Sequence, residues 1–310
     1  VVRDDEVDPL THRLVGHLGR ERQACHDPLD VAPWGHEQAH RIPFGSEAKR
    51  CYPFEGRGDV WDAWHADRIL SVHLMDTSRL SVPSVALSRD LRKAFRAARD
   101  LGAHAVELDA RHGLTPDEVS QTGLRQIRKW LGDEGLVVSA VAFPTRGGYG
   151  DADRLEARIS ATKAALKLAY DLGANLVLNH VGDIPPSSEG PEWRLMVDVL
   201  SDIGTWSQQV GATLCAEAGR ASPADLARLI AALPEASLVC DIVTGSLVVH
   251  GQDPVEAIAT LGSHVASVHA TDAVPGAFAG RGRAVVLGTG HVDFPPVFAA
   301  IVFVSATQTS

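Results

Sequence analysis

From Arg79 onward the chain alternates short apolar runs with longer amphipathic stretches, and this alternation constrains its fold more than any other feature. Apolar runs without internal polar positions are typical of parallel strands that are buried on both faces. Amphipathic stretches between such runs are typical of the helices that cross from one parallel strand to the next. The sequence therefore predicts an α/β fold built from repeated strand and helix units.

The expected elements follow from these runs and from proline and glycine punctuation. Strands are predicted over residues 80–87, 105–108, 136–142, 176–179, 213–217, 238–243 and 265–269. Helices are predicted over residues 89–101, 116–134, 152–172, 191–210, 223–233 and 254–261. Helices that begin with proline are expected at Pro116, Pro191, Pro223 and Pro254, where the missing N–H is tolerated. Thr115, Ser222 and Asp253 precede three of these prolines and are predicted N-caps.

This succession favours a (β/α)8 TIM barrel over an open, doubly wound sheet. No GxGxxG motif follows the first strand, so a dinucleotide-binding fold lacks its main signal. We expect the eighth unit to be incomplete. A helix over residues 296–300 runs into the apolar residues 301–306, which leaves too little chain for a full helix and a full last strand.

Residues 1–74 differ from the barrel predicted over residues 75–310. They hold half of the fourteen histidines and show no sustained period of a helix or a strand. We expect a poorly ordered, irregular extension there, and a chain start at Met75 fits the same pattern. Cys25 and His26 lack the spacing of a zinc finger, so a metal site is not predicted in this extension.

Composition narrows the partners and the compartment. The formal net charge of -10 repels phosphate backbones, which disfavours nucleic acid and anionic membrane surfaces. Cys215 and Cys240 lie inside predicted strands, which suggests reduced thiols, and we find no leader or membrane span. The sequence therefore predicts a cytoplasmic protein that binds a small molecule, and a homo-oligomer is compatible with it.

Glu217 is the first candidate for chemistry. It ends the apolar run 211–219, and a buried parallel strand has little room for a charge except near its carboxyl end. In an α/β barrel the carboxyl ends of the strands form the active face. The alternative is a structural carboxylate that caps the helix expected from Pro223.

Further polar residues are expected at the carboxyl ends of the other strands. They are Glu107, Asp109, Asn179, His180, Asp241, His269 and Asp272. Together with Glu217 they supply carboxylate oxygens and imidazole, a ligand mixture that suits Mn, Mg, Co or Zn. The alternative for each histidine is a hydrogen-bonded structural role, and the alternative for Asp272 is a cap on the following turn.

Four short motifs give the chain a family resemblance. They are Ala-Val-Glu-Leu from Ala105, Ala-Glu-Ala-Gly from Ala216, Val-His-Ala-Thr-Asp from Val268, and Leu-Gly-Thr-Gly-His-Val-Asp-Phe from Leu287. Through them, residues 79–298 resemble the xylose isomerase-like TIM barrel family of sugar-phosphate isomerases and epimerases. The resemblance implies a catalytic base, a divalent metal and a sugar or sugar-phosphate substrate.

In that family the metal is held by a Glu after the fifth strand, an Asp after the sixth, a His after the seventh and a Glu after the eighth. The resemblance assigns the first position to Glu217, which would be both base and ligand, and the third to His269. At the sixth position the chain has Val243, so Asp241, two residues earlier on the same face, is the substitute ligand. The final Glu has no counterpart. Glu107, Asn179, His180 and Asp272 are then assigned to substrate binding.

Three functions remain open at this point. The first is a metal-dependent isomerase or epimerase with a degraded metal site, acting by proton abstraction next to a carbonyl through an enediolate. The second is a catalytically impaired member that binds metal weakly or not at all and serves as a binding scaffold. The third is a relative of the abasic-site endonucleases, which the acidic charge disfavours.

Overall fold

A computed structural model describes residues 80–278 and 280–308 of the chain. The irregular extension predicted over residues 1–74 lies outside these residues. Seven parallel strands form one sheet in which every strand pairs with its neighbour in the chain. They are β1 (Ser81–Pro83), β2 (Ala105–Asp109), β3 (Val137–Ala142), β4 (Leu176–Asn179), β5 (Thr213–Ala218), β6 (Leu238–Val243) and β7 (Val265–His269).

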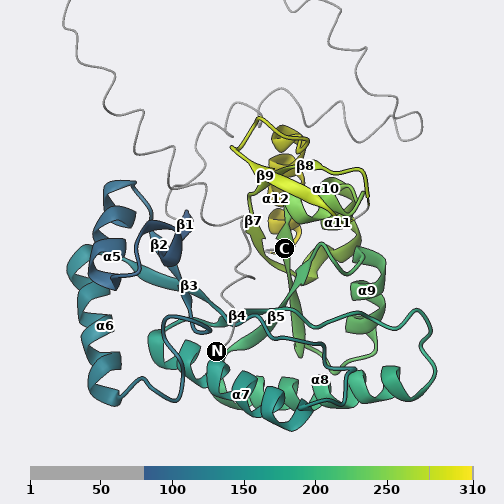
Figure 1. The fold of residues 1–310 in the computed structure, drawn as a ribbon, viewed down its shortest axis with the longest axis horizontal. Helices are drawn as coiled ribbons and strands as arrows, with labels where there is room; N and C mark the ends of the chain where they lie inside the picture. Colours follow the sequence, from purple (N-terminus) through teal and green to yellow (C-terminus); the bar gives the residue numbers. More distant parts are fainter. Residues whose placement is uncertain (1–79, 279, 309–310) are drawn as a thin grey trace, which may run out of the picture. The chain divides into compact units, whose positions relative to one another are not determined.

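Helices cover the outer face of this sheet, which curls into a half-barrel (Figure 1). They are α4 (Ser84–Leu87), α5 (Leu91–Asp100), α6 (Gln121–Glu134), α7 (Leu155–Leu172), α8 (Pro191–Val210), α9 (Pro223–Ala231), α10 (Thr244–Val249), α11 (Pro254–Leu261) and α12 (Phe294–Gln308). A short 3-10 helix, Gly262–His264, precedes β7. The prediction of an α/β fold of the TIM barrel type is confirmed. Among the described residues, β1 and β7 are the edge strands of the sheet and no eighth parallel strand joins them.

Caps and prolines explain where several helices begin. Ser222 accepts a hydrogen bond from the backbone N–H of Asp225, and Asp253 accepts from Val255 and Glu256. These side chains satisfy backbone donors that have no partner within the helix. Both caps and the proline starts of α8, α9 and α11 agree with the sequence prediction.

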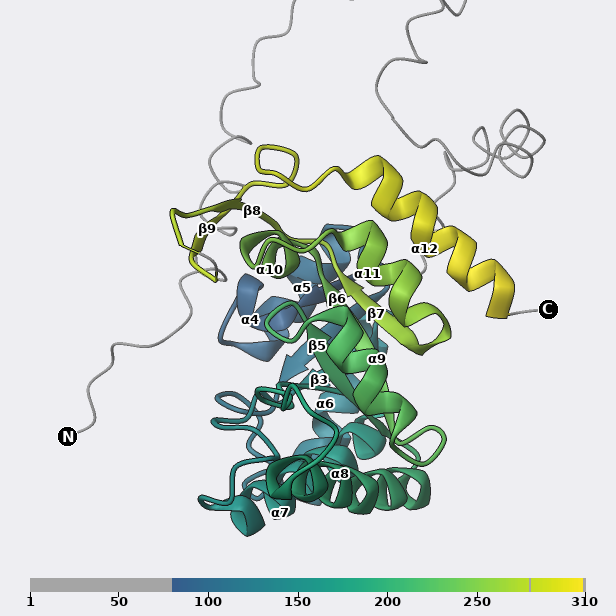
Figure 2. The ribbon, with the colours of Figure 1, turned by 90° about the vertical axis from the view of Figure 1, so that its right-hand side faces the viewer.

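Three predicted elements are wrong in extent. The strand expected over residues 80–87 ends at Pro83, which has no N–H to continue a ladder, and α4 follows. The helix expected from Pro116 begins only at Gln121, because Ser120 rather than Thr115 caps it. Residues 301–306 continue α12, which packs along α11 (Figure 2).

A hairpin after β7 was not predicted. Its strands, β8 (Asp272–Pro275) and β9 (Gly282–Val285), pair antiparallel in a sheet of their own. The residues of β9 are exposed or half-buried and do not alternate between apolar and polar, so sequence periodicity could not reveal this strand. The hairpin contacts α10, and it follows the carboxyl end of β7 directly.

Apolar side chains fill both sides of the sheet, but very unequally. The large cluster lies between the strands and the outer helices. On the inner face a small cluster consists of Ala140, Leu178 and Cys215, with Leu176 and Val239 packed against it. Cys215 and Cys240 are buried free thiols, and burial raises the pKa of Cys240 to about 12. The thin inner layer leaves room on that face for the polar side chains of β2, β6 and β7.

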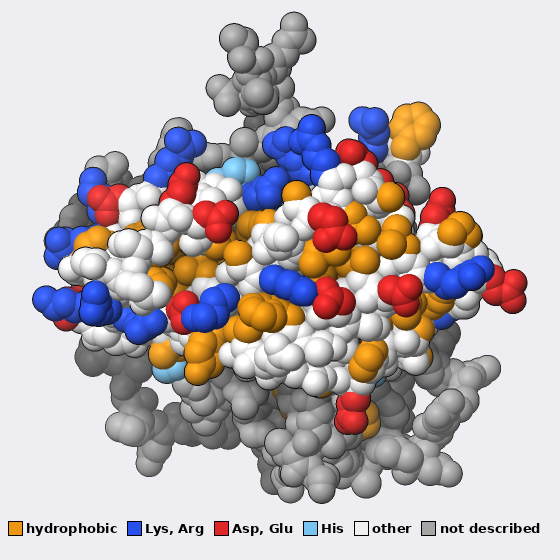
Figure 3. Space-filling view, turned by 90° about the horizontal axis from the view of Figure 1, so that it is seen from below, with side chains coloured by type: hydrophobic (Ala, Val, Ile, Leu, Met, Phe, Trp, Pro, Cys, Tyr) orange, Lys and Arg blue, Asp and Glu red, His pale blue; other side chains and the backbone are white. Residues whose placement is uncertain are grey.

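The outer surface of α7 and α8 is a mixed one. Figure 3 views the molecule from their side, and basic, acidic and hydrophobic side chains alternate over it. Lys163 on α7 pairs with Asp202 on α8 at 2.7 Å. Mixed charge of this kind is typical of a solvated helical face. No helix in the described part of the chain is long and apolar enough to cross a membrane.

Candidate functional site

Glu217 lies near the carboxyl end of β5, next to a histidine from the neighbouring strand. Asn179 pairs in register with Ala216, which brings the following residue, His180, beside Glu217. Nδ1 of His180 lies 3.3 Å from Oε2 of Glu217, and the two side chains are 50% and 27% exposed. A carboxylate and an imidazole that both reach solvent can bind, hold and exchange a proton.

A second cluster joins three strands across the inner face. Nδ1 of His269, on β7, lies 2.7 Å from Oδ2 of Asp241 on β6. Its Nε2 lies 2.7 Å from Oε2 of Glu107 on β2. Asp241 is 1% exposed and Glu107 15% exposed, so the imidazole is held between two largely buried carboxylates.

The two carboxylates decide the protonation of His269. An ionised carboxylate only accepts hydrogen bonds, so both ring nitrogens must donate, and the ring is an imidazolium. Burial by itself lowers the pKa of His269, but the hydrogen bonds and charges of Asp241 and Glu107 outweigh it and raise the pKa to about 11. The ring therefore carries a positive charge at neutral pH that the two carboxylates balance.

This arrangement does not fit a divalent metal at the predicted ligands. Ligation by His269 needs a nitrogen lone pair, and both ring nitrogens lie at hydrogen-bond distance from carboxylates, which favour a proton on each. In the described part of the chain no group of three or more His, Cys, Asp or Glu side chains is arranged so that it could hold a metal ion. One observation remains: Oδ1 of Asp241 is buried and has no hydrogen-bond partner among the described residues.

The two clusters lie on neighbouring strands. Glu217 pairs in register with Asp241, so both side chains point to the same face of the sheet. The structure thus brings four of the predicted site residues to the inner face: Glu217, Asp241, His269 and Glu107. His180 contacts this set from the end of β4.

Asn179 and Asp272 lie apart from these clusters and hold loops at the carboxyl edge. The fully buried Asn179 donates from Nδ2 to the carbonyl of Phe143 at 2.7 Å and accepts from the Thr145 hydroxyl at 3.1 Å. The carboxylate of Asp272 accepts four backbone N–H groups. Their donors are Ala273, Gly288, Gly290 and Val292. A substrate-binding role for either residue stays a prediction.

The loops after β3 and β4 cross at a pair of glycines, a feature that periodicity could not reveal. A Cβ on Gly148 would lie 2.6 Å from Cα of Gly182, and a Cβ on Gly182 would lie 2.2 Å from Cα of Gly148. The N–H of Tyr149 donates to the carbonyl of Val181 beside this crossing. Arg158 donates to four carbonyls of the first loop, so both loops are fixed in place.

Asp109 and Arg111, near the end of β2, complete this edge, and no motif in the sequence predicted a role for Arg111. Asp109 accepts from the backbone N–H groups of Arg111 and His112 through Oδ1 and thereby closes a tight turn. The guanidinium of Arg111 lies 5.6 Å from the centre of the Phe143 ring. The sequence offered one signal for Arg111: it follows Asp109, a carboxylate predicted at a strand end, by two residues.

Comparisons with known proteins agree with this architecture. The family model described as "Xylose isomerase-like TIM barrel" matches residues 95–304. A comparison with curated proteins gave no match. Among solved structures, a xylose isomerase domain protein from Planctomyces limnophilus has a TM-score of 0.64 and 22% identity, covering 73% of this chain and 86% of that one.

Two other solved structures share the fold at lower identity. A D-psicose 3-epimerase, solved in the presence of D-fructose, has a TM-score of 0.58 and 14% identity over 73% of this chain and 81% of that one. A xylose isomerase-like TIM barrel protein from Mycobacterium smegmatis, solved in complex with magnesium, has a TM-score of 0.56 and 18% identity. It covers 72% of this chain and 79% of that one. At these identities the similarity concerns the fold.

Proposed function

Because the chain belongs to the xylose isomerase-like TIM barrel family, we propose that it is an isomerase or epimerase of a small sugar or sugar phosphate. The observation that carries the proposal is the contact between Glu217 and His180 at neighbouring strand ends. Both groups reach solvent at the edge where barrel enzymes hold their substrates. The sugar epimerase among the structural neighbours supports the substrate class.

The proposed reaction is a proton transfer next to a carbonyl. The Glu217 carboxylate takes the proton from the carbon beside the carbonyl, which leaves an enediolate. The proton on Glu217 exchanges with solvent, and a proton is then returned by Glu217 to the neighbouring carbon (isomerisation) or by solvent to the opposite face of the same carbon (epimerisation). His180 contacts Oε2 of Glu217, so it orients the carboxylate and shares the proton while Glu217 holds it. The catalytic role thus falls to Glu217 and the positioning role to His180.

A divalent metal is the part of the family's chemistry that the described arrangement does not accommodate. When bound, such an ion polarises the carbonyl and stabilises the enediolate. Here His269 would first have to release Asp241 or Glu107. The proposal therefore assigns the proton transfer to protein groups alone and routes no step through a metal.

The buried free thiols and the acidic charge support the rest of the proposal. Cys215 and Cys240 are unpaired in the described part of the chain, as expected for a reducing compartment such as the cytoplasm. The net charge of -10 favours a small-molecule substrate over nucleic acid.

Deuterium exchange tests the proposal directly. The protein is incubated in D₂O with a panel of ketoses, aldoses and their phosphates, and label next to the carbonyl is followed by NMR. We expect incorporation into at least one sugar and a loss of about 10² to 10⁴ in rate for Glu217→Gln. The matched control is Glu192→Gln, on the exposed first turn of α8, which should keep the parental rate. If no sugar takes up label, the scaffold function replaces the enzyme.

A further inference from the structure

The carbonyl of His180 is bound by a side chain from the loop that follows β3. The hydroxyl of Thr145 lies 3.0 Å from this carbonyl, 3.1 Å from Oδ1 of Asn179 and 3.3 Å from the carbonyl of Gly147. These three oxygens can only accept, so the hydroxyl is the donor, and the carbonyl of His180 is the nearest of them. Because Thr145 is buried, water competes little for this proton.

The same loop holds the residues on either side of His180. Nδ2 of Asn179 donates to the carbonyl of Phe143 at 2.7 Å, and the N–H of Tyr149 donates to the carbonyl of Val181 at 2.9 Å. The side chains of Asn179 and Val181 are buried, whereas that of His180 is 50% exposed. His180 is therefore the one exposed side chain of three consecutive residues whose backbone or side chain the loop binds.

The loop is anchored on α7 by buried polar groups. The hydroxyl of Tyr149 lies 2.8 Å from Oγ1 of Thr162, which itself donates to the carbonyl of Arg158 at 2.9 Å. The proton of Thr162 is thereby used, so Tyr149 is the donor. Burial raises the pKa of Tyr149 to about 12, and the phenol keeps its proton at neutral pH. The guanidinium of Arg158 also donates to the carbonyls of Arg146 and Gly148, so the loop is fixed to a helix where it meets β4.

We infer that Thr145 is a positioning residue: its hydroxyl holds the carbonyl of His180 and thereby places the imidazole against Glu217. This inference rests on the proposed function, in which His180 orients the Glu217 carboxylate. A half-exposed imidazole is restrained less by packing than a buried one, so its place depends on the backbone that carries it. Thr145 is buried and acts through His180, so its loss should slow the chemical step and leave substrate binding unchanged.

The first test follows the contact itself and needs no substrate. In the full chain labelled with ¹³C-histidine, the Cε1–Hε1 resonance of His180 is assigned by its absence from His180→Asn. Glu217→Gln removes the charge beside the ring and should shift this resonance in the parent. In a Thr145→Val background the same substitution should cause less than half of that shift. Thr145→Ser keeps the hydroxyl and should preserve the full shift.

The second test uses the deuterium exchange assay. Thr145→Val should lower kcat by roughly 10 to 10² and change KM by less than about twofold, because the groups that react are misplaced while the binding groups remain. Thr145→Ser should restore most of kcat. Exchange at the parental kcat in Thr145→Val would overturn the inference and sustain the proposed function. If no sugar takes up label, the proposed function fails, and the resonance of His180 alone decides whether Thr145 places the ring.

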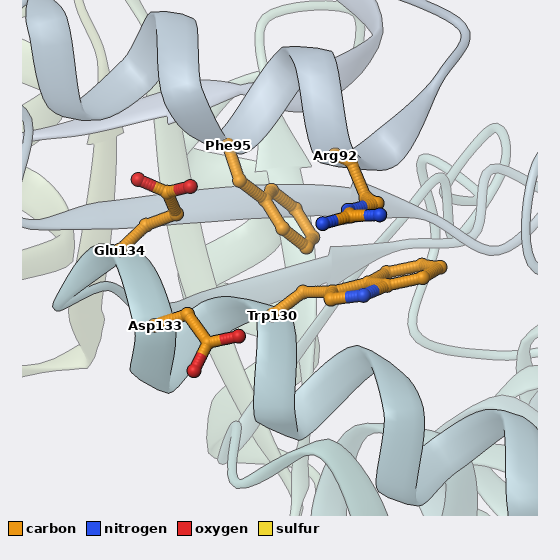
Figure 4. Close-up of a pocket in the computed structure, with 5 residues that line it drawn as sticks. All are labelled: Arg92, Phe95, Trp130, Asp133 and Glu134. Atoms are coloured by element: carbon orange, nitrogen blue, oxygen red, sulfur yellow. The ribbon is translucent and has the colours of Figure 1, made fainter.

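A control in the helical layer separates positioning from a general loss of stability. Phe95 is fully buried on α5 beside Trp130 of α6, in a surface pocket that Arg92, Asp133 and Glu134 also line (Figure 4). Phe95→Leu leaves a cavity there and should destabilise the fold while it keeps the resonance shift and kcat of the parent. A full shift in Thr145→Val, or equal losses in Thr145→Val and Phe95→Leu, overturns the inference.

Discussion

Glu107 on β2 and His269 on β7 meet across the inner face of the sheet at 2.7 Å, although their strands share no backbone pairing. Asp241 binds the other nitrogen of the same ring. The imidazolium therefore ties the edge strand β7 to β2, the neighbour of the other edge strand, where no eighth strand is present among the described residues. Removing the ring would leave the buried Asp241 carboxylate without its counterion.

His269→Gln should accordingly destabilise the fold by about 3 kcal/mol, the usual cost of removing one partner from a buried ion pair. Urea denaturation followed by circular dichroism measures it. The control is His104→Gln, since His104 is exposed and its loss should change stability by no more than about 0.5 kcal/mol. Equal midpoints for the two variants would contradict the bridging role.

The same bridge predicts a pH dependence. The pKa of His269 is raised from 6.5 to about 11, so its contribution to stability is fully present below pH 6.5 and is lost as pH rises through the folded value. Between pH 7 and 9 the parent's free energy of unfolding should fall by up to about 1.4 kcal/mol per pH unit. His269→Gln should remove this slope. Measurements stay at or below pH 9. Above pH 9 the buried thiol of Cys240, with a pKa of about 12, also lowers the free energy of unfolding as pH rises.

Asp272→Ala should cost about 3 kcal/mol, because it leaves four backbone N–H groups without their acceptor. Asp253→Ala, which removes an ordinary helix cap, should cost about 1 kcal/mol and serves as the control. Burial raises the pKa of Asp272, but the four N–H donors outweigh it and lower the pKa, so this stability is lost as pH falls through the folded value. Equal losses for both variants would show that Asp272 is only a cap.

Gly148→Ala should destabilise the protein by more than about 2 kcal/mol, because the new methyl group would meet the backbone of Gly182 at 2.6 Å. Gly132→Ala is the matched control. Gly132 lies inside α6 with open space around its Cα, so alanine there should stabilise by about 0.5 to 1 kcal/mol. Thermal unfolding of both variants gives the comparison, and a neutral Gly148→Ala would mean that the loops can separate.

Val243→Asp should tighten Mn²⁺ binding at least tenfold, about 1.4 kcal/mol, because it adds a carboxylate at the register partner of His269. Val243 is the N-cap of α10 and makes no side-chain cap, so aspartate should stabilise the metal-free protein by about 1 kcal/mol. Val243→Asn provides the same cap without the charge and should leave Mn²⁺ affinity at the parental level. Calorimetric titration of the three proteins decides, and tight binding by the parent would contradict the account of His269.

Much of the strand order could be predicted from the sequence, because each buried strand is a short apolar run with its own turn signals. Glu217 was expected near the carboxyl end of the fifth strand and lies there, although its role stays a prediction. Ser222 and Asp253 were readable as caps because a proline follows each of them. All of these signals are local.

The features that escaped prediction depend on chain segments far apart. No spacing rule places Glu107 beside His269, since their contact follows from the curvature of the whole sheet. The crossing of Gly148 and Gly182 depends on two loops at once. Residues 301–306 were ambiguous because a short apolar run is compatible with a strand or a helix. In the structure they continue α12 and are helical.

The sequential strand order has a consequence for how the chain folds. Each strand can pair as soon as its predecessor is in place, so these pairings close much shorter loops than a contact between β2 and β7 does. The contact between Glu107 and His269 instead closes a separation of 162 residues. Loop-closure entropy places such a contact late, after β1 to β7 have assembled. Its loss should therefore accelerate unfolding and leave the refolding rate nearly unchanged.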